Sequence, residues 1–325
     1  ALVGTGSIAR AHAHALRLLQ HGCLPPLECH VILGSTEAKA RTFADEFGFA
    51  HVGSDLASVL ADEQVNAVIL CSPSALHAAQ AEQALRAGKH VLCEIPLALS
   101  LAETDRLIEI QETAKCCLMV GHTLRYQPAL LKLRQQIAAG ELHPHAAVCR
   151  WMFERRENIL PTGQPRTWTD NLLWHHGCHA VDGMLWLLGA DQAAVSSQVA
   201  LPGQDLGIPM DITLTVRTAR DQLATAVLSY NSRVPLVDFV VIGEESTQIV
   251  DGGEFRTQFH IVEDGLSHPI AQQDAEFFTA IREGREPAVS ARGVRPAMAA
   301  LQSAQKNYDD LLQRRGLTVR HPRFP

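Results

Sequence analysis

A short apolar run followed by a glycine-rich turn opens the sequence, and no other feature constrains the fold as strongly. Residues 1–3 (ALV) precede GTGSIA at 4–9, which has the spacing GxGxxA, and a helical pattern follows over about 7–21. Glycines here allow a tight turn and close approach of the backbone, and the free N–H groups at a helix start attract a pyrophosphate. The pattern predicts a strand–turn–helix unit that binds a dinucleotide, or else a tight turn without a ligand. The residues expected at the phosphates are Gly4, Gly6, Ser7, Ile8 and Ala9.

Short apolar runs alternate with helical patterns through the first 121 residues. The runs are continuous rather than alternating in polarity, which is typical of parallel strands buried on both faces. They lie at 28–33, 66–71, 90–93 and 116–121. This alternation predicts a Rossmann domain over 1–121, with a parallel sheet covered by helices on both sides.

After His122 several strand-like stretches alternate polar and apolar residues, as LSYNSRV at 228–234 does. Such alternation predicts an antiparallel sheet with one solvated face. Strands are expected at 146–155, 193–200, 210–218, 222–231, 236–242 and 254–262, and helices near 128–139, 170–188, 269–284 and 294–315. We therefore expect an α/β protein in which residues 122–325 form an α+β domain with a large, mainly antiparallel open sheet. An exposed apolar face of that size is unusual in a monomer, which predicts a homodimer or homotetramer formed through the sheet.

Charge and hydropathy argue against several classes of partner. The net charge is −7 and no Lys/Arg-rich run is present, so we expect no nucleic acid and no membrane as a partner. No apolar run approaches the ~20 residues of a spanning helix, and no signal peptide precedes the first strand. The eight cysteines are scattered without a CxxC pair, which favours reduced thiols in a cytoplasmic protein. Because only three residues precede Gly4, we expect the natural chain to begin further upstream.

The turn after the second strand bears on the choice of cofactor. NAD-binding proteins usually place a carboxylate there, which holds the ribose 2′-hydroxyl. This chain has Gly34-Ser35-Thr36, whose hydroxyl groups would not repel the 2′-phosphate of NADP, so we expect NADP rather than NAD. The alternative is that Glu37 holds the ribose one turn later. The residues expected at this end of the cofactor are Ser35 and Thr36, with Arg10 or Lys39 as further donors.

Two further segments carry a family resemblance. With the phosphate loop, CSPSALHAAQAEQALRAGKHVLCEIPLA at 71–98 and GCHAVD at 177–182 make the chain similar, from end to end, to the Gfo/Idh/MocA oxidoreductases. Most of that family has Glu-Lys-Pro where this chain has Glu94-Ile95-Pro96, and the family lysine assists proton transfer from a sugar hydroxyl. Sugar oxidation built on that lysine cannot run unchanged here. The residues that the resemblance places at the nicotinamide ribose and pyrophosphate are Cys71, Ser72, Pro73, His77 and Glu94.

A narrower resemblance accounts for the missing lysine. The Glu-Ile-Pro segment, GHTLRYQP at 121–128, RREN at 155–158 and PRTWTDNLLWHHGCHAVD at 165–182 resemble the 4-carboxy-2-hydroxymuconate-6-semialdehyde dehydrogenases. This resemblance implies oxidation of a cyclic hemiacetal to 2-pyrone-4,6-dicarboxylate with NADP or NAD, in protocatechuate 4,5-cleavage. A hemiacetal hydroxyl is more acidic than a sugar hydroxyl, so a neutral imidazole can accept its proton without an ammonium group. Ile95 would then be an apolar wall against the nicotinamide or the substrate ring.

The general base is expected on the helix near 170–188. His175, His179 and Asp182 are spaced i, i+4 and i+7, which places them on one helical face, and His176 points about 100° away. The family pattern has an Asp four residues before its histidine, where this chain has His175. We expect His179 to be the base and His175 its hydrogen-bonding partner or a substrate ligand, with Asp182 able to orient His179. Glu94 completes the expected catalytic group. The alternative is a set of structural core histidines; no metal is expected, because no third ligand is evident.

A dicarboxylate substrate needs cationic side chains, and arginine suits bidentate carboxylate binding. Arg155 and Arg156 are adjacent on an expected strand and face opposite sides, so only one can line the pocket, and we choose Arg155. For each arginine the competing explanation is a surface or interdomain ion pair. The expected substrate residues are Arg125, Arg155, Asn158, Arg166, Trp168 and His176, with His122 and Thr169 as further neutral donors.

Two other functions stay open. One is a sugar or cyclitol dehydrogenase of the same family that has lost its lysine. The other is a regulator that binds NADP without turnover, which predicts a second domain poor in reactive side chains. The histidines and arginines of the matched segments favour an enzyme.

Overall fold

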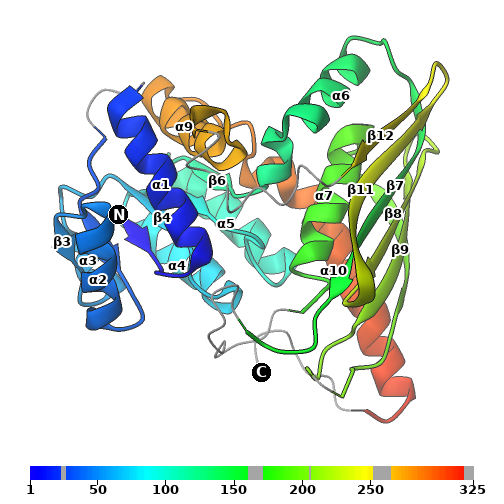
Figure 1. Cartoon of the computed structure of the whole chain (residues 1–325), viewed down its shortest axis with the longest axis horizontal. Helices are drawn as coiled ribbons and strands as arrows, with labels where there is room; N and C mark the ends of the chain where they lie inside the picture. The colour runs from blue at the N-terminus through cyan, green and yellow to red at the C-terminus, as the bar shows by residue number, and fades with distance from the viewer. Residues whose placement is uncertain (23–26, 160–170, 205, 252–264, 318–325) are drawn as a thin grey trace. The chain divides into compact units, whose positions relative to one another are not determined.

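The computed structural model describes residues 1–22, 27–159, 171–204, 206–251 and 265–317. The chain divides into two compact units. The first unit comprises residues 1–126 and 257–293, and the second comprises residues 127–256 and 294–325. The elements of each unit are coloured along the chain in Figure 1.

The first unit contains a six-stranded sheet in which every neighbouring pair of strands is parallel. Its order is β3-β2-β1-β4-β5-β6. The bounds are β1 Leu2–Val3, β2 Val31–Leu33, β3 His51–Val52, β4 Ala67–Leu70, β5 His90–Cys93 and β6 Leu118–Val120. Most of these residues are buried, as the continuous apolar runs predicted, and the expected parallel sheet is confirmed. The two-residue strand β3 was not predicted, because His51 and Val52 form no apolar run.

Helices connect these strands and pack against the sheet. They are α1 Ser7–Gly22, α2 Glu37–Phe47, α3 Leu56–Ala61, α4 Ser74–Arg86 and α5 Leu101–Ala114, followed by the 3₁₀ helix η1 Thr123–Tyr126. The side chains of Thr36, Asp55 and Ser100 cap α2, α3 and α5 by accepting hydrogen bonds from backbone N–H groups of the first turn. No described helix has both the length and the apolar character needed to cross a membrane.

A segment from late in the chain completes the first unit. It contains η3 Gly265–Ser267 and α9 Pro269–Glu283. Figure 1 shows α9 beside α1, and the two helices share a cluster of Ala11, Ala15, Ile270 and Ala271. Further on, Val120 N–H donates to the carbonyl of Val289 at 2.9 Å. The sequence analysis assigned everything after 122 to the second domain, whereas 257–293 lies with the first unit, because the chain returns there to cover α1.

The second unit contains the other six-stranded sheet, in the order β12-β11-β7-β10-β9-β8. Its neighbouring pairs are antiparallel except β7 with β10, so the expected large, mainly antiparallel sheet is confirmed. The strands are β7 Pro144–Glu154, β8 Ala193–Val199, β9 Asp211–Thr218, β10 Leu223–Ser229, β11 Asn231–Gly243 and β12 Thr247–Asp251. The strand expected at 254–262 lies outside the described residues, and β12 was not predicted.

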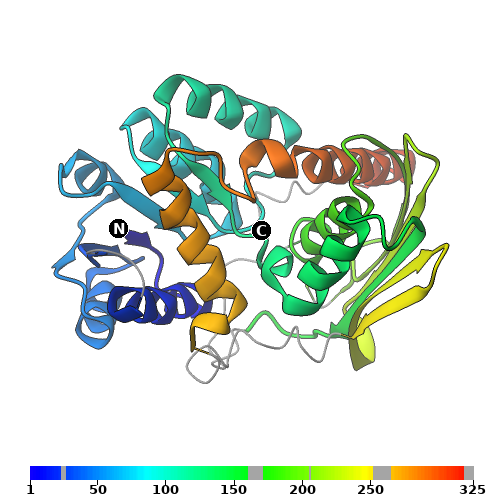
Figure 2. The ribbon, with the colours of Figure 1, turned by 90° about the horizontal axis from the view of Figure 1, so that it is seen from above.

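Three helices lie on one face of this sheet: α6 Pro128–Ala138, α7 His176–Leu188 and α10 Ala291–Arg314. Figures 1 and 2 show them on the same side. Strand β9 is buried at every second residue, as an amphipathic strand requires, and its Ile212, Leu214 and Val216 face the helices. The indole N–H of Trp174 donates to Gln305 of α10 at 2.9 Å.

No helix among the described residues covers the opposite face of this sheet. Ile249 is 67% exposed there, and Val240 of the neighbouring strand pairs with it. Val148 pairs in turn with Val240. The same face holds the ion pair of Arg150 with Asp238. The expected one-sided sheet is therefore present, with apolar side chains on its open face.

Candidate active site

The phosphate loop has the geometry that its glycines predicted. Gly4 has a φ of +117°, and an added Cβ would lie 2.5 Å from the carbonyl oxygen of Cys71, so only glycine fits there. Its N–H donates to the carbonyl of Leu33 at 2.8 Å. A Cβ at Gly6 would meet no atom within 4 Å, so the space beside that residue is open, and α1 begins at Ser7. This loop and helix start fit the pyrophosphate of a dinucleotide.

The turn after β2 lies beside the phosphate loop. A Cβ added to Gly34 would come within 3.1 Å of Thr5 Cγ2 and of Ala40, so the two turns are in close contact. Ser35 and Thr36 are exposed, and Thr36 also caps α2 by accepting from the N–H of Lys39 at 3.3 Å. The turn itself holds no carboxylate. These residues stand where the ribose end of a dinucleotide is bound in this type of sheet.

Two other charged groups near this turn, Arg10 and Glu37, have partners of their own. Arg10 forms a two-pronged ion pair with Glu46, and its guanidinium lies 5.1 Å from the ring centre of Phe47. The expected use of Arg10 for a 2′-phosphate would have to displace Glu46. Glu37 bonds to Arg41 on the same helix.

One histidine joins the loops that follow β4 and β5. The buried ring of His77 lies between the carbonyl oxygens of Ser72, 2.7 Å from Nε2, and Pro96, 2.8 Å from Nδ1. The Ile95–Pro96 peptide bond is cis. The Ser72 hydroxyl donates to Gln80 of α4. These are loops at the carboxyl ends of neighbouring parallel strands, which is where the sequence analysis expected the cofactor.

Glu94 follows β5 and belongs to a buried network that the sequence analysis did not predict. Its Oε1 lies 3.0 Å from Nε2 of His12, on α1. Nδ1 of His12 lies 2.9 Å from both carboxylate oxygens of Asp274, on α9. A Cβ at Gly121 would come within 2.6 Å of the Glu94 carboxylate, so glycine leaves the room that this side chain occupies.

The histidine of this network is held in its charged form. Burial opposes the charge and is the largest single influence, but Asp274 and Cys71 together raise the pKa of His12 well above its usual range. The signal that could have pointed to it is a histidine on the apolar face of α1, in ARAHAHAL. A buried histidine needs a polar partner, but the sequence does not show which one.

The helix that carries the expected base begins later than predicted. The expected start near 170 is wrong for the described residues, because α7 begins at His176. Asn171 is the reason: its side chain accepts from the N–H of Leu173 at 2.8 Å, which forms a turn in place of helix. His175 is therefore the N-cap residue of α7, and its ring stacks on His176 with centroids 4.2 Å apart. The expected helical stripe does not include His175.

Two histidines of α7 lie against one tryptophan of β7. The ring of His179 lies parallel to Trp151, with centroids 5.5 Å apart and planes 7° apart. His176 stacks on the same indole at 5.2 Å, and its Nδ1 lies 2.7 Å from the hydroxyl of Tyr230. Phe153 closes the group, 5.1 Å from both the His176 and Tyr230 rings. The sequence analysis named the histidines but missed Trp151, Phe153 and Tyr230. Aromatic residues are common in strands, so nothing in the local sequence distinguished these three.

The adjacent arginines of the second unit follow β7, which ends at Glu154 and not at 155 as expected, and they have different partners. Arg155 lies over the ring of Tyr230 at 5.1 Å and donates to Oδ1 of Asn158 at 2.9 Å. Arg156 is exposed and donates to Asn231 at 2.6 Å. The structure therefore brings Arg155, Asn158 and His176 together around Tyr230.

The other expected substrate residues are in the first unit or outside the described residues. Arg125 lies in η1 of the first unit, is buried, and donates to the carbonyl of Gly293 at 3.2 Å. Arg166, Trp168 and Thr169 lie outside the described residues.

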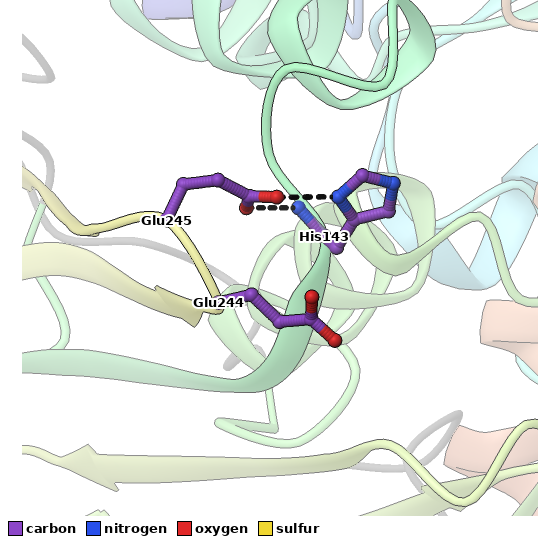
Figure 3. Close-up of side chains that lie close together, drawn as sticks. All are labelled: His143, Glu244 and Glu245. Carbon is purple, nitrogen blue, oxygen red and sulfur yellow. Dashed lines mark hydrogen bonds and ion pairs between the residues drawn. The ribbon is translucent and has the colours of Figure 1, made fainter.

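A third polar cluster lies at the end of the second sheet where β7 begins and β11 turns into β12. Figure 3 shows His143, Glu244 and Glu245, whose possible ligand atoms lie within 4.8 Å of one another. All three are exposed, and Glu245 accepts from both the ring Nδ1 (2.6 Å) and the backbone N–H (2.8 Å) of His143. The hydrogen bond from the His143 ring lowers the pKa of Glu245 to about 2. The sequence analysis named no metal site, and these bonds make the cluster a polar clamp between the two strands.

Comparison with known families matches both halves of the chain. Residues 1–122 match the GFO_IDH_MocA model, described as "Oxidoreductase family, NAD-binding Rossmann fold". Residues 128–271 match a model described as "Bacterial oxidoreductases, C-terminal".

Individual relatives agree with these matches. The 4-carboxy-2-hydroxymuconate-6-semialdehyde dehydrogenase of Sphingobium sp. (strain NBRC 103272 / SYK-6) is 36% identical over 300 residues, which are 88% of this chain and 91% of that protein. The myo-inositol 2-dehydrogenase of Thermotoga maritima is 30% identical over 145 residues, which are 44% of this chain and 42% of that protein.

Solved structures share the fold over nearly the whole chain. A levoglucosan dehydrogenase in complex with NADH and levoglucosan superposes with a TM-score of 0.81 at 19% identity, covering 95% of this chain and 96% of that one. A putative myo-inositol dehydrogenase from Sinorhizobium meliloti superposes with a TM-score of 0.78 at 20% identity, covering 95% of this chain and 97% of that one.

Proposed function

This chain belongs to the Gfo/Idh/MocA family of NAD(P)-dependent oxidoreductases, and from that premise we propose that it oxidises the cyclic hemiacetal of 4-carboxy-2-hydroxymuconate-6-semialdehyde to 2-pyrone-4,6-dicarboxylate. The 36% identity to the dehydrogenase of that substrate supports the assignment, because it extends over most of both chains. The single observation that carries the chemistry is the stack of His179 and His176 on Trp151. It offers imidazole groups to a reaction for which this chain lacks the family lysine, since Ile95 takes that position.

The reaction removes a hydride from the hemiacetal carbon and a proton from its hydroxyl, which leaves the lactone carbonyl. The bound dinucleotide supplies the hydride acceptor. His179 accepts the hydroxyl proton as general base. The resulting imidazolium faces the indole of Trp151, and an aromatic face attracts a cation at this distance. Water is not consumed, and no covalent intermediate with the protein is needed.

Arginine would bind the carboxylates of this substrate. Arg155 is half-buried and rests on the Tyr230 ring, so its planar group is already oriented by the protein. Oδ1 of Asn158 accepts a hydrogen bond from one nitrogen of the Arg155 guanidinium. The guanidinium has further N–H groups that can donate to a ligand. We assign Arg155, Asn158 and His176 to substrate binding, together with Arg125, Arg166 and Trp168 on the resemblance alone.

We assign NADP as the preferred cofactor, with NAD as the alternative. The exposed hydroxyls of Ser35 and Thr36 support this choice, because a carboxylate in that turn would repel a 2′-phosphate. Cys71, Ser72, Pro73, His77 and Glu94 are assigned to the nicotinamide half, on the loops after β4 and β5. His175 is kept as a candidate ligand of the substrate.

A comparison of substrates tests the proposed function. Purified protein is mixed with NADP and one of three substrates, namely ring-cleaved protocatechuate, myo-inositol or glucose, and reduced nicotinamide is followed by absorbance. We expect turnover with the first substrate only. Turnover with inositol or glucose alone would instead identify a sugar or cyclitol dehydrogenase. NADPH binding with no turnover of any of the three would identify a regulator.

We also propose a homodimer or homotetramer formed through the open face of the second sheet. Val148, Val240 and the exposed Ile249 form an apolar row on that face, and burying such a row on a second copy removes it from water. Sedimentation of the wild type and of Ile249→Lys tests the proposal. We expect the substitution to shift the protein towards monomer, and a wild type that sediments only as a monomer would contradict it.

A further inference from the structure

The buried network around His12 has a defined direction, from the interior of the first unit towards its surface. The side chains of Asp274 and His12 are fully buried, whereas the side chain of Glu94 is 10% exposed. Glu94 is therefore the member that can reach a ligand, and the other two lie behind it. Its N–H donates to the carbonyl of Leu70, the last residue of β4, so Glu94 stands at the carboxyl edge of the parallel sheet. That edge is where open parallel sheets bind their ligands.

With Asp274 and Glu94 both ionised, the contacts of His12 are those of a charged ring. Nδ1 lies 2.9 Å from the oxygens of Asp274 and Nε2 lies 3.0 Å from Oε1 of Glu94. Carboxylates only accept hydrogen bonds, so a ring that bonds both must donate from both nitrogens, and only the imidazolium does so. The remaining group facing the ring is the thiol of Cys71, and burial raises the pKa of that thiol. One cation thus lies between two carboxylates that would otherwise be buried without compensation.

We propose that His12 is a positioning residue that fixes the Glu94 carboxylate for the nicotinamide ribose, with Asp274 holding the imidazolium in place. The proposal rests on the proposed function, because it assumes that Glu94 contacts the nicotinamide half of the cofactor. One oxygen of Glu94 is committed to His12. The other lies 3.3 Å from the N–H of Ile95, at the limit of a hydrogen bond, and so has capacity to accept from a ribose hydroxyl.

The charged ring of His12 joins three separate elements of the first unit. His12 comes from α1, Glu94 from the end of β5 and Asp274 from α9, so the network ties the phosphate-loop helix to the nicotinamide end of the sheet. A charge-assisted hydrogen bond is usually stronger than a neutral one. Such a bond fixes the rotamer of Glu94 before the cofactor arrives, which lowers the entropy cost of binding.

Binding of two nucleotides separates this role from a purely structural one. The dissociation constants are measured for NADPH and for adenosine 2′-phosphate 5′-diphosphate, which lacks the nicotinamide riboside. The variants are His12→Gln and Glu94→Gln, with His14→Gln as a matched control on the same helix, because His14 packs edge-on against Phe47 and not in the network. If NAD proves to be the cofactor, NADH and ADP replace the two probes.

We expect His12→Gln and Glu94→Gln to weaken NADPH binding by about 10- to 100-fold, which is the range of a hydrogen bond to a charged group. The dissociation constant of adenosine 2′-phosphate 5′-diphosphate, the fragment, should stay unchanged. His14→Gln should change neither constant. Should His12→Gln unfold the protein, Asp274→Asn tests the same network, and we expect it to weaken NADPH binding without affecting the fragment. If His12→Gln weakened the binding of both nucleotides equally, His12 would be a structural support of α1 and the proposal would be overturned. Unchanged NADPH binding would also overturn it. Because turnover is not measured, a wrong substrate assignment leaves this result intact.

Discussion

The imidazole of His179 and the indole of Trp151 lie parallel, with ring centroids 5.5 Å apart and an angle of 7° between their planes. An indole face attracts a cation within about 6 Å, so this arrangement favours the imidazolium that forms when His179 takes a proton. His176 shares the same indole, one turn earlier on α7. Trp151 of β7 therefore orients the rings of both His176 and His179.

Replacement of Trp151 by leucine should lower kcat without removing activity. Loss of the aromatic face destabilises the imidazolium by an amount that corresponds to about 2- to 30-fold in rate. The limb of the kcat–pH profile that reports the base should move to lower pH, because the imidazolium loses its proton more easily. Trp151→Phe keeps an aromatic face and should lie between leucine and the wild type. An unchanged profile in Trp151→Leu would show that the stack has no part in the reaction.

Replacement of His179 by alanine should lower kcat by ~10²–10⁴, the usual contribution of a general base. Binding of NADPH should barely change, and fluorescence titration measures it. His176→Ala, at the neighbouring position of the same stack, should act mainly on KM through substrate binding. Near wild-type turnover in His179→Ala would remove His179 from the role of base.

The adjacent arginines provide a matched pair for substrate binding. Arg155→Gln should raise KM for the dicarboxylate by ~10- to 100-fold, because it removes a charged donor from a carboxylate. Arg156→Gln should have little effect, since Arg156 is exposed and bonded to Asn231. Steady-state kinetics of both variants measure the difference. If Arg156→Gln raised KM more than Arg155→Gln did, Arg156 and not Arg155 would be the residue that binds the carboxylate.

A carboxylate placed in the turn after β2 should change the cofactor preference. Ser35→Asp should favour NAD over NADP, because the new charge repels a 2′-phosphate and accepts from a 2′-hydroxyl. Glu37→Gln is the control, and it should leave the ratio of kcat/KM for the two cofactors unchanged. If Glu37→Gln moves that ratio while Ser35→Asp does not, the ribose is held by Glu37.

The buried charge of His12 should make stability depend on pH. Its pKa in the folded protein is raised, so the native state keeps a proton that the unfolded state releases above its ordinary value of about 6.5. The contribution to the free energy of unfolding is complete below that pH and is lost as pH rises through the folded pKa, with a slope of up to about 1.4 kcal/mol per pH unit.

Urea denaturation at about pH 6, 7.5 and 9 checks this prediction. We expect wild-type stability to fall over that range more steeply than that of His12→Gln, which lacks the titrating group. Parallel curves for the two proteins would mean that His12 keeps an ordinary pKa.

Local patterns predicted much of the fold. Continuous apolar runs at 66–71 and 90–93 became β4 and β5, because a strand buried on both faces has no polar positions. The glycines of the phosphate loop predicted its geometry, since the φ of Gly4 and its distance to Cys71 admit no side chain. The open antiparallel sheet followed from alternation along the later strands.

Some local predictions failed where a side chain competed with the backbone. The apolar pattern before His176 continues that of α7, but the Asn171 side chain takes the N–H of Leu173 and delays the helix. His175 then stacks on His176 in a way that helical spacing does not describe. The sequence contains the asparagine, yet propensity alone does not decide between a turn and a helix at that position.

The sequence by itself determined the two classes of sheet, the phosphate loop and which histidines and arginines are available for chemistry. Only the tertiary structure decided that Asp274 returns to bond His12 across 262 residues of chain, and that Trp151 lies under His179. The physical reason is that periodicity records which face of an element is buried, whereas a contact between distant side chains depends on how those faces pack. The local sequence around a residue therefore does not show which distant residue it contacts.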